Sequence, residues 1–180
     1  MAITTRSQFD TRPLRDLVRE LLSLPDGSVR PTWDAGPTGR EPFVVVSAND
    51  DTPIGSARRD FDGEREIEIL RRSLMTEVLF EAYGTNAYAL LSKLQLAFES
   101  STALSALKNR VRAAILRVTR VIDVSAAVGG GPEERARFTA TFTHTHAVEI
   151  PQPRIEAVDI VVRTDRVVET LTLDLPTTEQ

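Results

Sequence analysis

The sequence predicts an α+β fold, in which one mostly antiparallel sheet carries helices packed on one face. Three observations lead to this prediction. The apolar pattern gives the element order α-β-β-α-α-β-β, and the links between the predicted strand pairs are short. The 180 residues, 41% hydrophobic and 27% charged, suit one globular core. We therefore expect a single domain over residues 1–150, followed by a β-hairpin or an extended β-prone arm over residues 151–180.

The first predicted element is an amphipathic helix that begins near Thr11, a possible capping residue, with Pro13 in its first turn. Its apolar face repeats at helical spacing through Leu14, Leu17, Val18, Leu21 and Leu22. A turn at residues 24–27 ends it. The following residues 30–42 are interrupted by prolines and glycines, which predicts a surface loop whose Trp33 folds back onto the core.

The middle of the chain predicts two strands on either side of a long loop. Residues 43–47 form a short β-branched run, which indicates a buried strand. Residues 48–66 are rich in charge and contain two glycines and a proline, so they predict a loop longer than most in compact domains. Residues 73–84 alternate as a half-buried strand, with Leu74, Val78 and Phe80 on one face.

Two helices and two strands follow. Thr85 is placed to cap a helix over residues 86–100, and a shorter helix follows from about Ser101. Residues 114–128 are predicted to form a strand by their β-branched content, and the "GGGP" at 129–132 to form the turn into the last strand. After residue 150 two prolines introduce two further β-rich runs, which fit either a hairpin on the sheet edge or an arm that adds strands to a neighbour.

The last strand of the predicted domain holds both histidines of the chain, His144 and His146. They continue the apolar face that alternates from Ala136 through Phe142. Two imidazoles at this spacing could hold a metal, but a third ligand is needed, and the sequence offers only scattered carboxylates. We favour histidines at the rim of the core, and we predict no metal and no cofactor.

Other candidate chemistry is weak. The "GPTGR" and "GGGPEER" stretches lack the residues of a phosphate-binding loop, and "DFDGE" at 60–64 has its glycine too early for a calcium loop. Glu77 and Glu81 share a strand face but are four residues apart, too far for a direct acid/base pair. A nucleophile signature is missing, so we predict that the protein is not an enzyme.

The composition of the chain argues against several classes of binding site and cellular location. A net charge of −4 gives no overall attraction to nucleic acid, although a local basic patch is compatible with it. The absence of cysteine excludes disulfides and zinc-thiolate sites. The N-terminus lacks an export signal and the chain lacks a long apolar run, so we expect neither export nor a membrane. Arginines outnumber lysines 20 to 2, which fits either interface use or codon bias.

The stretch "MTEVLFEAYGTNAYALLSKLQ" at 75–95 resembles the phage neck terminator, or tail terminator, family: a strand, then Tyr-Gly, then Asn-Ala opening a leucine-spaced helix. The preceding order is similar too, with a leucine-rich helix, the "VRPTWDAGP" stretch at 29–37, a short strand and a charged segment. The resemblance spans about residues 14–147. The tail after Pro151 departs from it.

The resemblance implies a structural virion protein, assembled in the host cytoplasm and located in the tail or neck. It would form a ring, in this family a hexamer, that caps the tail tube, ends tube growth and joins the tail to the head connector. The implied partners are other copies of the chain, the tail tube protein, the head-side connector, stopper or collar proteins, and the sheath protein if the tail is contractile. DNA would pass through the lumen without specific binding.

Two sets of residues are the candidate contact sites. The charged loop is expected to contact the tube or connector through Asp50, Asp51, Arg58, Arg59, Asp60 and Asp62. The C-terminal arm is expected to bridge neighbouring subunits through Arg154, Ile155, Val158, Ile160 and Val162. Two alternatives stay open: another connector or stopper subunit, and a small ligand-binding or enzymatic domain with its site near Glu77, Glu81 and Tyr83.

Overall fold

The computed structural model describes the chain except for residues 1, 33–41, 129–130, 154–156, 164–167 and 175–180. For residues 127–128, 131–132, 157–163 and 168–174 it describes the backbone alone. Trp33, Arg154 and Ile155, together with half of the predicted "GGGP" turn, lie outside the described residues.

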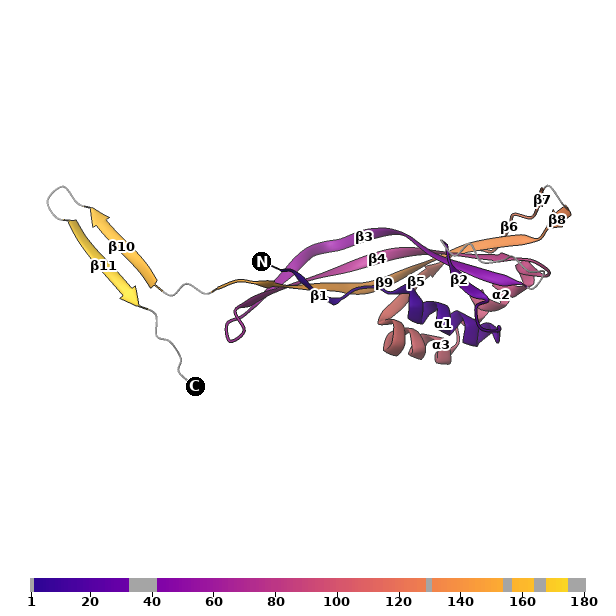
Figure 1. Ribbon diagram of the computed structural model, residues 1–180, viewed down its shortest axis with the longest axis horizontal. Coiled ribbons are helices and arrows are strands. Elements are labelled where there is room, and N and C mark those ends of the chain that lie inside the picture. Colours follow the sequence, from indigo (N-terminus) through magenta and orange to yellow (C-terminus); the bar gives the residue numbers. More distant parts are fainter. Residues whose placement is uncertain (1, 33–41, 129–130, 154–156, 164–167, 175–180) are drawn as a thin grey trace.

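The architecture is α+β, as the sequence predicts, and is built on one seven-stranded sheet (Figure 1). Every strand pair in this sheet is antiparallel except β2 with β3. The main path is β1 (Thr4–Ser7), β9 (Arg135–Pro151), β4 (Ile67–Tyr83), β3 (Phe43–Asp62) and β2 (Val29–Pro31). β5 (Ala113–Val118) and β6 (Ile122–Asp123) pair with β9 on the same side as β1.

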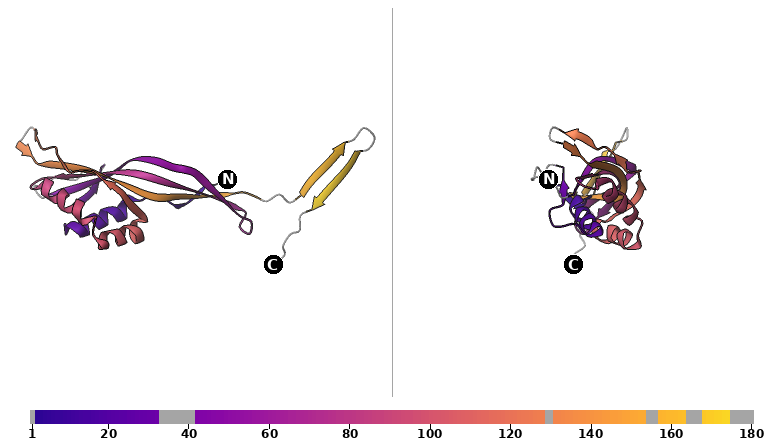
Figure 2. Two further views of the ribbon diagram at one scale, coloured as in Figure 1. Left: turned by 180° about the vertical axis from the view of Figure 1, so that it is seen from behind. Right: turned by 90° about the vertical axis from the view of Figure 1, so that its right-hand side faces the viewer.

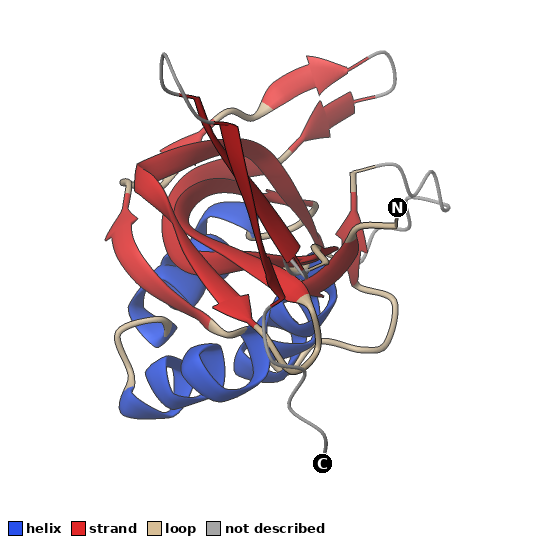
Figure 3. Ribbon diagram, turned by 90° about the vertical axis from the view of Figure 1, so that its left-hand side faces the viewer, coloured by secondary structure: helices blue, strands red, loops and turns tan. Residues whose placement is uncertain are grey.

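The helices gather on one side of the sheet (Figures 2 and 3). They are α1 (Thr11–Leu22), α2 (Ala87–Ala97), α3 (Ser101–Ala106) and the π-helical turn η1 (Leu107–Val111). The predicted caps were wrong by one residue at both helix starts. Asp10 caps α1, because its carboxylate accepts the Arg12 N–H at 2.8 Å, and Asn86, not Thr85, occupies the N-cap of α2.

The core lies between these helices and the facing side of β3, β4 and β9. Phe80 of β4 stacks on Phe138 of β9 with ring centroids 4.9 Å apart, and Phe98, just after α2, meets Phe80 edge-on at 5.5 Å. All three rings are at most 1% exposed. The alternation that predicted these strands therefore identifies the face that the helices cover.

The prediction of a loop over residues 48–66 was wrong. β3 runs without interruption to Asp62, β4 starts at Ile67, and only residues 63–66 form the turn. The sequence concealed this strand because two register shifts, at Ala48/Asp50 and Ile54/Arg58, break its alternation, and its charged residues have low β-propensity. Pairing with β4 holds the segment extended in spite of its composition.

Three other strand predictions need correction. β1 was missed, because its four polar residues show no apolar pattern. The single strand predicted over residues 114–128 is divided into β5, β6 and β7 (Ala126–Val128), and β7 pairs with β8 (Gly131–Glu133) as a separate hairpin. The loop predicted over residues 30–42 starts two residues later, because Arg30 and Pro31 belong to β2, which pairs with β3.

The last described strands, β10 (Ala157–Arg163) and β11 (Val168–Asp174), form an antiparallel hairpin of their own. Val158, Ile160 and Val162 alternate along β10. In the described part of the chain neither strand pairs with the seven-stranded sheet. The division of the chain at residue 150 stays a prediction.

Candidate assembly surface

The sheet continues beyond the helices as a slender extension (Figure 1). We call this extension the arm; it is a different segment from the C-terminal arm after residue 150. It comprises β1 together with residues 50–62 of β3, 67–74 of β4 and 145–151 of β9, all of them described. Within it, Ile69 and Ala147 are the only buried hydrophobic residues. The arm therefore lacks a core of its own and depends on strand pairing and side-chain contacts.

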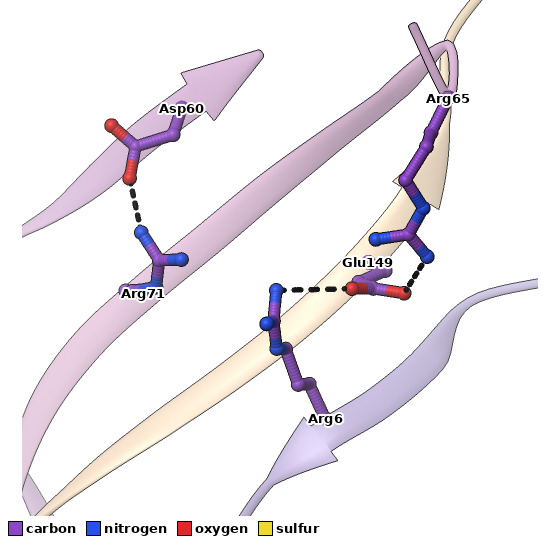
Figure 4. Close-up of polar contacts among 5 residues, drawn as sticks. All are labelled: Arg6, Asp60, Arg65, Arg71 and Glu149. Carbon is purple, nitrogen blue, oxygen red and sulfur yellow. Dashed lines mark hydrogen bonds and ion pairs between the residues drawn. The ribbon is translucent and has the colours of Figure 1, made fainter. Parts of the chain in front are cut away.

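One face of the arm carries ion pairs (Figure 4). This outer face is the one opposite to the face of Val78 and Phe80. On it, Glu149 accepts from Arg6 at 3.3 Å and from Arg65 at 3.4 Å, so that β9 is linked to β1 and to the β3–β4 turn. Asp60 pairs with Arg71 across the strands and with Arg58 at 3.0 Å. These exposed pairs fix side-chain positions and add little stability individually.

The other face of the arm, its inner face, continues the alternation of the core without helices above it. Leu70, Val148 and Ile150 are half-buried there, and Phe61 at the tip is 53% exposed. Arg59 lies 3.9 Å from Glu68 at the edge of this group. Apolar side chains flanked by charges on an exposed strand face are typical of a surface that contacts another protein.

The six residues predicted to contact a partner all lie on β3, and most have partners within the chain. Asp51, Arg58, Arg59 and Asp60 bond to other side chains, and Asp62 accepts the backbone N–H groups of residues 64 and 65 at 3.2 Å. Asp50 differs. It lies directly opposite Glu77 of β4, a like-charge pair, and in the described part of the chain it makes no ion pair.

A hydrogen-bonded chain of three side chains marks the junction between arm and body. The hydroxyl of Thr76 donates to Asp51, whose carboxylate can only accept. The same hydroxyl must then accept from Nε2 of His144, 2.7 Å away, which places the imidazole proton on that nitrogen. Thr76 is 2% exposed. The three hydrogen-bonded side chains therefore link β3, β4 and β9 at the point along the sheet where the helices no longer cover it.

The environment of His144 favours the neutral ring. Nδ1 is buried and has no hydrogen-bond partner, which suits a nitrogen without a proton, and Phe9 stacks on the ring at 5.0 Å. Burial lowers the pKa of His144, and the charge of Asp51 opposes this effect more weakly. Among the described residues no three histidine or carboxylate side chains lie close enough together to bind a metal.

The surface proposed for the ligand-binding alternative is occupied by its own side chains. Arg135 donates to Glu81 at 2.6 Å and lies over the ring of Tyr83 at 4.7 Å. Tyr83 in turn stacks on Phe43 at 4.9 Å. Burial, followed by the charge of Glu81, raises the pKa of Tyr83. These side chains bond to and stack on one another, although Nε of Arg135 is buried without a hydrogen-bond partner, and Glu77 stands apart from them opposite Thr141.

Sequence reasoning found the charged segment but missed the arm's apolar inner face and β1. The signal for the inner face was present, because Val148 and Ile150 continue the alternation of the last strand. In the described part of the chain no helix is long and apolar enough to cross a membrane.

A known protein family matches more of the chain than the predicted resemblance covers, because the match continues past Pro151. The family model for the phage neck terminator protein matches residues 11–166, which include all the helices and every strand of the large sheet except β1. No curated protein matches the chain.

Proposed function

The chain belongs to the phage neck terminator family, whose members are structural proteins of the virion neck, and from this premise we propose that it forms a ring on the tail tube. The ring is a hexamer that ends tube polymerisation and then joins the tail to the head-side connector. Its role is structural rather than enzymatic. Assembly takes place in the host cytoplasm, and a sheath protein is a further partner if the tail is contractile.

The observation that carries the proposal is the arm. A sheet segment of four strands with two buried hydrophobic residues gains little from its own packing, and isolated small sheets are marginal in water. Such a segment is retained when a partner uses it. In a ring, the inner face around Leu70, Val148 and Ile150 would lie against the tube or the adjacent subunit, which would bury Phe61.

The predicted contact residues take distinct places in this scheme. Asp50 and Glu77 form an acidic pair open to a basic partner surface, whereas Asp51, Arg58, Arg59, Asp60 and Asp62 mainly fix the shape of the arm. The C-terminal residues Arg154, Ile155, Val158, Ile160 and Val162 are proposed to bridge subunits. DNA would pass through a lumen formed by a mildly acidic chain, which limits its attachment.

Trimming the arm tests this function. Ile54 pairs with Ser73, so an Asn-Gly turn can replace residues 55–72 and close a shorter hairpin. The helical body keeps its core, and we expect the trimmed chain to fold but to leave tail tubes uncapped and of uncontrolled length in electron micrographs. The matched control is Tyr88→Ser, which alters a side chain of α2 that is as exposed as Phe61.

Tubes of normal length capped by the trimmed chain would contradict the proposal. Binding of the unaltered chain to the portal side, and not to tubes, would favour the connector or stopper alternative. Thermal stabilisation by a metabolite, together with a monomer in light scattering, would favour the ligand-binding alternative.

A further inference from the structure

β5 is an edge strand. It pairs with β9 from Ala113 to Val118, and in the described part of the chain no strand pairs with its other side. Its outer backbone groups are therefore available to an added strand. Leu116, at the register shift of β5, is 59% exposed, and Ile122 just beyond is 41% exposed. An apolar edge with free backbone groups is suited to pairing with another chain.

The same edge is basic, although the whole chain is acidic. Residues 108–120 hold five cationic side chains and no acidic one: Lys108, Arg110, Arg112, Arg117 and Arg120. Glu20 binds Arg110 through both carboxylate oxygens, at 2.6 and 2.9 Å. The other four cations have no acidic partner among the described residues. The edge of β5 thus carries positive charge that this chain does not neutralise.

The second strand of the C-terminal hairpin, with the residues after it, has the complementary composition. Residues 167–180 contain three acidic side chains, Glu169, Asp174 and Glu179, and no lysine or arginine. The strand β11 alternates leucines and threonines between the first two of these acids. On one side it pairs with β10 over all seven residues. Because a two-stranded hairpin is marginally stable alone, β11 gains stability if a third strand covers its free side.

We propose that β11 of one copy adds to the outer edge of β5 in a second copy. Backbone hydrogen bonds would supply the pairing, and Glu169 and Asp174 would meet the arginines of the β5 edge. This inference rests on the proposed ring, and it specifies which surface the C-terminal arm of each subunit binds. Six identical contacts of this kind, each between unlike surfaces, close a ring head to tail.

The strand pairing within one chain favours a second copy over the same chain. The near end of β5, Ala113, pairs with His144, and β9 continues for seven residues to Pro151, about 24 Å at 3.4 Å per residue. From Pro151 to Ala157, the start of β10, six residue steps span at most about 22 Å. β1 also occupies this flank of β9. These lengths would let β10 begin close to the near end of β5, and its seven residues could run on along that strand. In the described structure, however, neither β10 nor β11 pairs with the sheet of its own chain, which leaves the edge of β5 to a second copy.

Cysteine cross-linking tests the contact cleanly, because the natural chain has no cysteine. Full-length Leu116→Cys is mixed with full-length Leu171→Cys or Thr172→Cys and oxidised mildly. Neighbouring residues point to opposite faces of a strand, so one of the two tail variants shares the face of residue 116. We expect a disulfide-linked dimer with one tail variant. Tyr88→Cys, 52% exposed on α2, is the matched control and should give none.

Charge exchange separates a specific contact from chance collision. Arg117→Glu with Arg120→Glu, added to the Leu116→Cys chain, should reduce the dimer about tenfold. Glu169→Lys with Asp174→Lys in the tail variant should restore it. A loss without restoration would count against the proposed charge pairing.

The remaining outcomes distinguish this inference from the proposed function. A ring in light scattering without the cross-link would overturn the contact and leave the ring standing. A cross-link that forms only when both cysteines are in one chain would assign the hairpin to its own subunit and overturn the inference. A monomer without any cross-link would contradict both proposals.

Discussion

The strands β3, β4 and β9 run through both ends of the large sheet, but helices cover them at one end only. At the body end, inward side chains of β4 and β9 are buried beneath α1, α2 and α3, and four phenylalanines pack together. At the arm end the same alternation continues, but without helices its apolar residues are half-exposed and ion pairs hold the outer face. One pattern thus builds a stable core at one end and a contact surface at the other.

The largest expected difference concerns two phenylalanines. Phe138→Ala removes a ring that is 1% exposed and stacked on Phe80, and it should lower the free energy of unfolding by about 3–5 kcal/mol. Phe61→Ala in the arm should change it by less than about 0.5 kcal/mol. Urea unfolding measures both. Equal losses of unfolding free energy would show that Phe61 is packed in the arm as well as Phe138 is packed in the body.

The junction between the two regions should be of intermediate importance. Thr76→Val leaves the Nε2–H of His144 and the carboxylate of Asp51 without their shared hydroxyl, at a cost of about 1–3 kcal/mol. Thr141→Val on the outer face of β9, where the hydroxyl makes no hydrogen bond in the described structure, is the control for the change in shape. If the two variants unfold alike in urea, the hydrogen-bonded chain contributes nothing to stability.

Acidity should weaken the same junction. Burial holds the pKa of His144 below its usual 6.5 in the folded protein, so as the pH falls through about 6.5 the unfolded chain takes up the proton first. The stability contributed by the neutral ring is complete above that pH and declines below it. His144→Phe should flatten the fall in unfolding free energy between pH 7 and pH 5. Parallel curves for the variant and the natural chain would exclude His144 as the cause.

The smallest effect should appear on the outer face beside the arm. Glu77→Lys replaces a like-charge pair with Asp50 by an opposite-charge pair and should raise the unfolding free energy by roughly 0.5 kcal/mol. If the acidic pair serves contact and not stability, the same change should impair tube capping. Glu77→Gln is the control that removes repulsion without adding attraction. If neither variant impairs tube capping, Asp50 and Glu77 are not part of the proposed contact surface.

The body was largely predictable and the arm was not, for a physical reason. Helical and strand spacing records burial, so Leu14, Leu17, Phe80 and Phe138 revealed their elements directly. In β3 beyond Ala48 neither face is covered by helices, and two register shifts disturb what alternation remains. The strand exists because β4 pairs with it, and pairing leaves no mark in composition. The residues predicted to contact a partner were chosen by their charge, and that prediction stays open, whereas the loop conformation predicted for them was wrong.

The position of β9 in the sheet determines when the fold can be completed during synthesis. β9 pairs with β1, β4, β5 and β6, and Thr4 of β1 lies opposite Glu149, near the end of the large sheet in sequence. During synthesis the N-terminal strand must therefore wait for almost the entire chain before it finds its partner, and such distant pairing is slow. Until β9 leaves the ribosome, the nascent polypeptide has neither a closed core nor a finished arm. The complete surface of the large sheet therefore exists only after translation has passed Glu149.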